Sequence, residues 1–431
     1  MSKHFLKFVL LQAVFSYHAY SQIELEGSKV LIGGVGAAYN PSFESAQINP
    51  AISPFVSTTT IEGNLPISYK KSNIRYPGQP TFTDSGFGFG FPMIGGIIKP
   101  MNRMAISVFA VPFAVSTKIE KSGLPFKVLD QISTIKLAGT GKLVHLYDIG
   151  AAYRINKTLS LGLRYYTSAF SGSVNILNSQ NSQIASVEAE MTNSFIQTGI
   201  YLRLNRAISL GLSANLNETS DSKTNMSTFA DGTLNNETTE EAPTKISKSL
   251  SKARIGIAIA LNSKTTISTD IEHKPKVEKK AASVVDFKVK PVDTYATTSF
   301  HFGGDYQFSS NKEIIFGAQN IPSSIGPGSI SQNKIGFGIT DILTNLGEIP
   351  SKPVFTLAVG LRFKHGKILN KAAIKKSVRS KTGRPDKIYQ LKIESGLAYS
   401  ETSIGVDDSG EQPGAYLATR YIIPIKFTYH F

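Results

Sequence analysis

The sequence contains no cysteine and no tryptophan, and it is poor in charged residues. Only 18% of its 431 residues are charged, whereas roughly 25% is usual for soluble domains. So little charge could not cover several globular surfaces, which disfavours a soluble multidomain enzyme. The absence of cysteine excludes disulfide frameworks, cysteine-ligated zinc, iron–sulfur clusters and thiol nucleophiles.

Long hydrophobic runs are also lacking. A membrane-spanning helix needs about 20 consecutive apolar residues, and no such stretch follows the N-terminus. The longest candidate, residues 87–98, is interrupted by glycines and a proline and is followed by Lys99. A helical membrane protein is therefore excluded.

The N-terminus has the three parts of a secretory signal peptide. Lys3 and Lys7 give a basic start, residues 8–15 form a short apolar core, and Ala19 and Ser21 are small residues at the positions that a signal peptidase reads. The alternative is a buried hydrophobic N-terminal helix. We predict a signal peptide over residues 1–21, cleaved after Ser21, so that the protein is exported.

The C-terminus alternates between apolar and polar residues. From Tyr421 every second residue is aromatic or aliphatic, and the sequence stops at Phe431. This resembles the C-terminal signal of outer-membrane barrels, which implies recognition of Phe431 by the barrel-insertion machinery. The alternative is an amphipathic edge strand of a soluble sandwich, which leaves the terminal phenylalanine unexplained.

The middle of the chain repeats a hairpin. Residues 150–162, 199–211 and 256–268 align without gaps, and Asn156, Asn205 and Asn262 occupy the same position in each. Each repeat has alternating apolar residues on both sides of a tight turn, where asparagine tolerates a positive backbone angle. Long polar or glycine-rich linkers at 171–192, 219–248, 276–293 and 321–353 separate the hairpins.

Short turns at one end and long loops at the other are typical of a transmembrane β-barrel. We therefore predict an all-β fold, an antiparallel barrel of about 14 strands with both ends on the periplasmic side. The predicted strands are residues 55–71, 84–98, 102–118, 145–156, 158–170, 193–204, 207–218, 249–261, 264–275, 294–308, 312–320, 354–364, 387–400 and 414–431.

The segment before the first strand is too long for a simple tether. It contains GGVGAAYNPSFESAQINPA over residues 33–51, which lacks the glycine spacing and βαβ context of a dinucleotide site. With a 14-strand count, this stretch resembles the FadL/TodX family of outer-membrane transporters for hydrophobic compounds. The resemblance implies that residues 22–54 form a hatch inside a barrel of residues 55–431. Its motif residues are Gly34, Gly36, Asn49, Pro50 and Ala51.

The third predicted strand is interrupted by Pro112, which cannot donate to a ladder. The resemblance implies a kink here, opening a lateral gap for an apolar ligand, whereas the alternative is a proline at an ordinary bulge. Phe109 and Phe113 lie on one face around Pro112 and are expected to face lipid or flank the gap. Pro92 leaves open whether the second strand is interrupted instead.

Residues 119–144 are expected to form an amphipathic lid, or a helix packing on the rim. Its apolar residues include Phe126, Leu129 and Ile132. Together with Phe109, Pro112 and Phe113, they are the predicted ligand-binding residues.

Catalytic and metal-binding motifs are absent from the sequence, and we expect no enzyme activity, no cofactor and no metal. His301 and Asp305 share one strand face and are interpreted as solvated lumen or rim residues. Residues 364–387 carry nine basic residues and one acidic residue. We interpret them as a solvated basic turn, able to meet anionic lipids or lipopolysaccharide, and we expect no nucleic-acid partner.

These features predict a passive outer-membrane channel of a Gram-negative bacterium. Its ligand would be a hydrophobic small molecule such as a long-chain fatty acid or an aromatic hydrocarbon. One alternative is a secretion-associated barrel that binds exported proteins, like the type IX secretion shuttle, and another is an outer-membrane enzyme.

Overall fold

The structure is a computed structural model. It describes residues 27–75, 81–89, 93–110, 115–128, 131–230, 233–240, 248–276, 283–284, 287–288, 296–322, 354–365, 368–369, 387–388, 391–405 and 415–430. The predicted signal peptide, Pro112, Phe113, Leu129, Phe431 and most of the basic turn lie outside these ranges.

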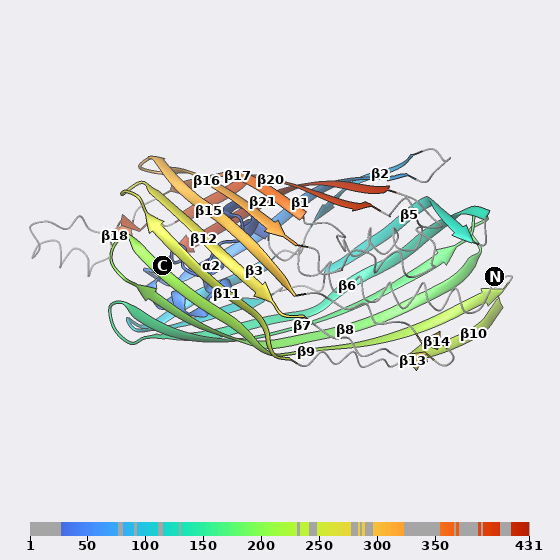
Figure 1. Ribbon diagram of the computed structural model, residues 1–431, viewed down its shortest axis with the longest axis horizontal. Helices are drawn as coiled ribbons and strands as arrows, with labels where there is room; N and C mark the ends of the chain where they lie inside the picture. Colours follow the sequence, from blue (N-terminus) through green and yellow to red (C-terminus); the bar gives the residue numbers. More distant parts are fainter. Residues whose placement is uncertain are drawn as a thin grey trace, which may run out of the picture.

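The described chain is almost entirely β-sheet, preceded by three short helices (Figure 1). The helices are η1 (Gly27–Ile32), α2 (Phe43–Ile48) and η2 (Pro50–Phe55). The strands are β1 (Thr60–Arg75), β2 (Phe82–Phe89), β3 (Met93–Met101), β4 (Met104–Ala110), β5 (Val115–Val128), β6 (Gln131–Arg154), β7 (Leu159–Leu177), β8 (Gln183–Arg203), β9 (Ile208–Ala230), β10 (Thr233–Glu240), β11 (Lys248–Ala260), β12 (Thr265–Lys274), β13 (Ser283–Val284), β14 (Phe287–Lys288), β15 (Thr297–Ser309), β16 (Lys312–Ile321), β17 (Val354–His365), β18 (Ile368–Leu369), β19 (Lys387–Ile388), β20 (Leu391–Gly405) and β21 (Ala415–His430). None of the helices in these ranges is long and apolar enough to cross a membrane.

One antiparallel sheet of 17 strand segments closes on itself, because β1 pairs with β21 along its whole length, from Thr60 opposite His430 to Arg75 opposite Ala415. Three positions in the wall are filled by two segments each. β2 and β3 both pair with β1, β4 and β5 both pair with β6, and β10 and β11 both pair with β9. The barrel therefore has 17 − 3 = 14 strands, which confirms the predicted fold.

Both ends of the barrel wall lie at the end that carries the short turns. Thr60 is opposite both His430 and Ile97, and the β3–β4, β6–β7, β8–β9 and β11–β12 turns follow around the same rim. In two of these turns, Asn156 and Asn205 accept backbone hydrogen bonds from residues two and three positions later. The repeated asparagine thus closes the turn with its own side chain.

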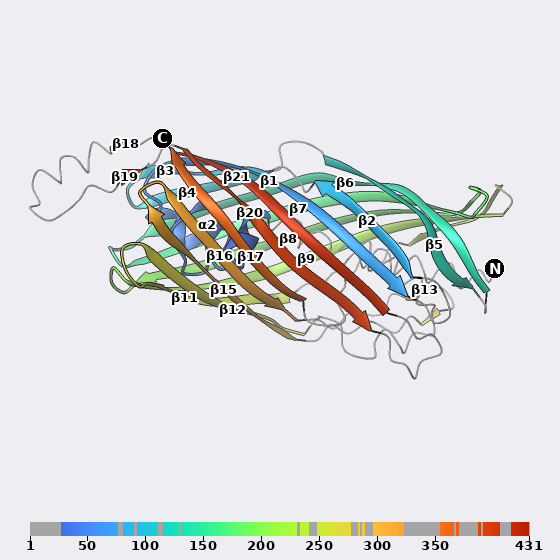
Figure 2. The same cartoon turned by 90° about the horizontal axis from the view of Figure 1, so that it is seen from above.

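Two segments that the sequence predicts to be loops form strand instead. Residues 171–192 form strand for most of their length, since β7 runs to Leu177 and β8 resumes at Gln183, and β9 and β10 occupy much of 219–248. The long strands β6 to β9, of 19 to 24 residues, extend beyond the short strands β12 and β16, of 10 residues each (Figures 1 and 2). A strand that projects beyond lipid has no apolar face, so its sequence loses the alternation that identifies a strand.

The predicted lid helix is also wrong. Within residues 119–144, β5 and β6 pair as an antiparallel hairpin from Val128 opposite Gln131 down to Val115 opposite Leu143. Short apolar runs do not by themselves distinguish helix from strand, and here the pairing with a long neighbouring strand decides.

The outer face of the barrel is apolar. Tyr147, Ile149 and Tyr153 on β6 are more than half exposed, as are Phe355 and Val359 on β17. So much contiguous apolar surface is typical of a face covered by lipid. The alternation of apolar residues in the first hairpin repeat thus corresponds to the face that β6 turns outward.

The inner face of the barrel is polar and is filled by residues 27–56, which we call the inner segment. Figure 1 shows α2 and its neighbours, in blue, enclosed by strands at the end with the short turns. η1 contacts β15, β16, β17, β20, β21 and β1, whereas η2 contacts β4, β6, β7 and β8. The inner segment therefore spans the lumen from one wall to the opposite one.

Candidate functional site

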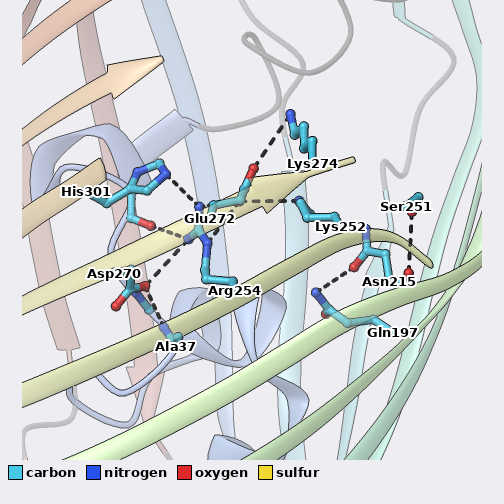
Figure 3. A network of polar contacts seen from close by, with 12 residues as sticks. Ala37, Gln197, Asn215, Ser251, Lys252, Arg254, Asp270, Glu272, Lys274 and His301 are labelled. Carbon is cyan, nitrogen blue, oxygen red and sulfur yellow. Dashed lines mark hydrogen bonds and ion pairs between the residues drawn. The ribbon is translucent and has the colours of Figure 1, made fainter. Parts of the chain in front are cut away.

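A buried charged cluster on β11, β12 and β15 holds the inner segment (Figure 3). Arg254 donates to the carbonyl of Gly34 at 2.7 Å and to Glu272 at 2.9 Å. Asp270 accepts hydrogen bonds from the backbone N–H groups of Gly36 and Ala37, at 2.8 and 2.9 Å. Both signs of charge on the wall are thus satisfied in part by the backbone of the inner segment.

His301 and Asp305, which share one face of β15, also contact the inner segment. His301 lies 3.0 Å from the carbonyl oxygen of Gly33 and 3.1 Å from Arg254, and the Tyr39 hydroxyl donates to Asp305. Both His301 and Asp305 are buried. The interpretation that they are solvated is therefore wrong: the inner segment covers them.

A second cluster lies around Lys426 on β21. Its ammonium group is 2.7 Å from Glu44 of α2, 2.9 Å from Glu394 of β20 and 3.9 Å from Glu62 of β1. Glu394 also pairs with Arg362 at 2.8 Å. Carboxylates from the inner segment and from two neighbouring strands therefore share one buried cation.

The glycine motif of the inner segment fits closely against wall glycines. Gly33 and Gly34 have positive φ angles of 63° and 72°, which glycine adopts without strain. A Cβ atom on Gly33 would overlap Ala318 and Phe302, and one on Gly317 would overlap Gly33. Gly34 lies beside His301 and Gln319, whereas Gly36 packs against Ile48 within the inner segment.

Asn49, Pro50 and Ala51 dock on the opposite wall. Asn49 is fully buried, donates to the carbonyls of Ala37 and Ile200 at 2.7 and 3.0 Å, and caps η2 by accepting from Ala51 N–H at 3.1 Å. A Cβ atom on Gly162 would overlap the backbone of Pro50 and Ala51, and one on Gly199 would overlap the Asn49 side chain. The motif thus begins the helix that leads into β1.

Two neighbouring wall positions each contain a short stretch outside the described residues, 90–92 between β2 and β3 and 111–114 between β4 and β5. Phe89 and Met93 are 93 − 89 = 4 positions apart, whereas their partners on β1, Ile67 and Asn64, are 67 − 64 = 3 positions apart. Ala110 and Val115 are 115 − 110 = 5 positions apart, whereas their partners on β6, Tyr147 and Leu143, are 147 − 143 = 4 positions apart. Both positions therefore carry one residue more than their partner strand between the described pairs.

Beyond these stretches, the described parts of the two positions are not paired with each other. β3 pairs with β4 from Met101 to Ile94, but among the described residues no ladder joins β2 to β5. The other edge of β2 pairs with β1, and that of β5 with β6. Within the described ranges, each of these two strands is thus paired along one edge only.

The predicted ligand-binding residues are distributed around this region. Phe109 is 7% exposed and packs against Phe43 of α2, so it faces inward and not toward lipid. Phe126 and Ile132 belong to the β5–β6 hairpin, where they are paired with Ser133 and Lys127. Pro112, Phe113 and Leu129 lie outside the described residues.

The charged clusters were not identified from the sequence. Their signal is a charged residue at every second position of a strand whose other face is apolar, as on β12, where Asp270 and Glu272 are buried and Ile271 is exposed. In a water-filled lumen the same pattern would describe solvated residues. Within the described ranges, no group of three acidic or histidine side chains is arranged to hold a metal ion.

Comparison with known proteins supports the fold. No family model and no curated protein matches the sequence. Solved structures do match it: a Pseudomonas aeruginosa FadL homologue has a TM-score of 0.60 at 11% identity, covering 94% of this chain and 97% of the other. The Pseudomonas putida toluene transporter TodX gives 0.60 at 12% identity, with 94% and 97% covered.

The Ralstonia pickettii toluene transporter TbuX gives a TM-score of 0.54 at 10% identity, with 95% of this chain and 100% of the other covered. At such low identity these structures show a shared fold. The resemblance predicted from residues 33–51 is thus confirmed as a FadL-type barrel fold.

Proposed function

We propose that the protein is an outer-membrane channel for the passive uptake of hydrophobic small molecules, such as long-chain fatty acids or aromatic hydrocarbons. The observation that carries the proposal is that no ladder joins β2 to β5 among the residues that the structure describes, above a lumen filled by the inner segment. A filled lumen does not suit an open pore for ions and sugars. An interrupted wall gives an apolar ligand an exit into the membrane.

In this proposal residues 1–21 are the signal peptide, residues 22–54 are the hatch and residues 55–431 are the barrel. The apolar outer face suits the outer membrane, with lipids and lipopolysaccharide around it and Phe431 as the signal for insertion. The solved structures of similar fold carry the names of a toluene transporter and a FadL homologue, which favours a channel over an enzyme.

The direct test is uptake of a labelled long-chain fatty acid, and separately of labelled toluene, by cells with and without the protein. Faster uptake of either compound by the cells with the protein is expected. Equal uptake of both compounds would refute the proposal. Heat-modifiable mobility of the purified protein checks that the barrel is folded in the same cells.

A secretion-associated barrel is the second candidate. It is favoured by the extension of β6 to β9 beyond the short strands, which gives a large sheet outside the barrel. Recovery of secreted proteins on the purified barrel, lost when the β7–β8 extension is shortened, would support this candidate. Unchanged recovery would count against it.

A further inference from the structure

Each short turn of the barrel carries an exposed basic residue. These turns join β3 to β4, β6 to β7, β8 to β9, β11 to β12 and β15 to β16. In each turn an asparagine is followed, one or two positions later, by a lysine or an arginine, and no turn contains an acidic residue. The basic residues are Arg103, Lys157, Arg206, Lys264 and Lys312, all of them exposed. Within the described ranges none of these side chains forms an ion pair, so their charges remain available to the surroundings of the barrel.

Hydrogen bonds between neighbouring turns hold the basic residues at one level of the barrel. In each turn one carbonyl accepts from a backbone N–H of the next hairpin, at 2.7 to 2.9 Å: Arg103 from Arg154, Thr158 from Arg203, Ala207 from Ala260, Lys264 from Gln307, and Asn311 from Lys364. Neighbouring strands are about 4.8 Å apart, so consecutive turns lie about 10 Å apart. The basic residues therefore form a row along this end of the barrel, which we call the basic rim.

The next connection along the same end is also basic. β17 ends with His365 opposite Leu391 of β20, and residues 364–387 carry nine basic residues and one acidic residue. At the opposite end, the extended parts of β8 and β9 expose acidic residues: Glu188, Glu190 and Asp221. Among the described residues, the end with the short turns therefore exposes charge of one sign.

An exposed apolar side chain precedes each basic residue by two to four positions. These side chains are 44% to 65% exposed: Met101, Ile155, Leu204, Leu261 and Phe308. They continue the apolar outer face of the barrel to the level of the turns. An anionic phospholipid matches both groups, because its acyl chains suit the apolar side chains and its phosphate suits the lysine or arginine. An acidic protein would match the charges alone.

We infer that the basic rim binds anionic phospholipid headgroups, such as phosphatidylglycerol, in the membrane leaflet at the end with the short turns. In outer-membrane barrels this is the periplasmic end. The inference rests on the membrane location in the proposed function and does not depend on transport. Long basic side chains keep their stems in the apolar layer while their charged ends reach the headgroups. Headgroups bound at successive turns would therefore hold the rim at the depth of the lipid phosphates.

The absence of tryptophan allows a local test, because an introduced tryptophan is the only one in the chain. Leu204→Trp places it beside Arg206, whereas Phe355→Trp places it on the outer face at the far end of β17. In vesicles of phosphatidylcholine and phosphatidylglycerol, quenching by the brominated form of each lipid measures the local preference for the anionic one. We expect a preference of about fivefold at position 204 and none at position 355. Equal quenching by both lipids at position 204 would overturn the inference, and is the result expected if an acidic protein is the partner of the rim.

Removal of charge tests whether the turns themselves bind the lipid. In the Leu204→Trp protein, Lys157→Gln together with Arg206→Gln should reduce the preference from about fivefold to below about twofold. Arg103→Gln together with Lys312→Gln is the matched control. It removes the same charge from turns about 20 Å from Arg206, beyond the roughly 8 Å over which physiological salt screens exposed charges. The control should keep the preference, and equal losses in both double variants would overturn binding at individual turns.

The inference and the proposed transport can fail separately. Heat-modifiable mobility checks that each variant forms a folded barrel in the vesicles. If phosphatidylglycerol is preferred at position 204 while cells with and without the protein take up fatty acid and toluene equally, the inference stands and the proposed transport fails. Faster uptake together with equal quenching would give the reverse.

Discussion

The two halves of the inner segment are held to the barrel in different ways. Residues 27–44 contact charged wall residues: Arg254, Asp270, Asp305 and Lys426 all reach this half. In residues 45–56, Pro50 and Ala51 lie against wall glycines, the Phe55 ring packs edge-on against Tyr201, and the wall cations Lys99 and Arg164 donate to backbone carbonyls. Wall glycines pack closely against the first half as well, at Gly33 and Ala37. Among the described contacts, the halves differ in that residues 27–44 meet buried carboxylates of the wall and contribute an acidic side chain, Glu44, to a buried ion pair.

The difference indicates which contact responds to a change of charge. Van der Waals contacts between the inner segment and the wall backbone depend steeply on distance, so a small displacement removes most of their attraction. A buried ion pair balances a large desolvation cost against a large attraction, so a competing charge or a shifted partner changes it strongly. We therefore expect the Glu44–Lys426 ion pair to be the contact of the inner segment that responds most strongly to a change of charge.

The largest expected effect follows removal of the Lys426 ammonium group. Lys426→Met would leave Glu44, Glu62 and Glu394 without their shared cation, and breaking a buried ion pair costs about 3–5 kcal/mol. We expect a lower midpoint of thermal unfolding, together with faster labelling of a cysteine placed at Phe43. Thermal unfolding in detergent and thiol labelling in membranes measure the two effects.

The control for this prediction is the double variant Lys426→Met, Glu44→Gln. Because it removes a charge of each sign, it should regain part of the lost stability but keep the fast labelling. A single variant as stable as wild type would contradict the importance of charge in the first half.

A smaller loss is expected from added volume in the second half. Gly162→Ala would place a methyl group against the backbone of Pro50 and Ala51, and overpacking of this kind costs about 1–3 kcal/mol. Gly63→Ala is the matched control, since a Cβ atom at Gly63 meets nothing within 4 Å. Thermal unfolding should separate the two variants, and equal midpoints would show that the second half is not tightly docked.

Much of the barrel follows from the sequence, because lipid imposes a simple pattern on it. Strands that cross the membrane must alternate, as residues 147–155 and 421–430 do, and the short turns carry asparagine at a repeated position. The number of strands and the position of both ends could therefore be predicted. The strands that continue into solvent carry no such pattern, which is why the sequence predicts a loop at 171–192.

The inner contacts could not be predicted in the same way. Arg254 meets Gly34, 220 positions away in sequence, only because β11 and the inner segment are brought together by the closure of the whole barrel. Phe109 has apolar neighbours in sequence, so its inward direction depends on the register with β3 and β6. Contacts of this kind need the three-dimensional register, which one sequence does not contain.

A third prediction concerns a single hydrogen bond in the first half. Burial, followed by the nearby negative charge of Asp305, raises the pKa of Tyr39 well above its usual value, so the phenol stays protonated and donates. Tyr39→Phe should lower stability by about 1.5 kcal/mol, as expected for a hydrogen bond to a charged group. Because the folded pKa is raised, the difference between the proteins should be full below the ordinary tyrosine pKa and should shrink above it. Unfolding midpoints at several pH values measure this, and a constant difference would argue against the bond.

The smallest expected effect tests whether the charged wall also meets the ligand. Lys252 and Lys274 lie beside Glu272 at 3.7 and 3.6 Å, and their side chains are 32% and 41% exposed. With Arg254 they give three cations beside the buried carboxylates of Asp270 and Glu272, and the two lysines are the partly exposed members of this group. A ligand with a carboxylate would be attracted, whereas a neutral hydrocarbon would not.

The double variant Lys252→Gln, Lys274→Gln should therefore slow uptake of a fatty acid about fivefold, since partly exposed ion pairs contribute up to about 1 kcal/mol. Uptake of toluene should be unchanged and serves as the internal control. Equal slowing of both compounds would mean that the lysines only support the fold. An effect on the fatty acid alone would show that the charged wall, besides holding the first half of the inner segment, also selects the ligand.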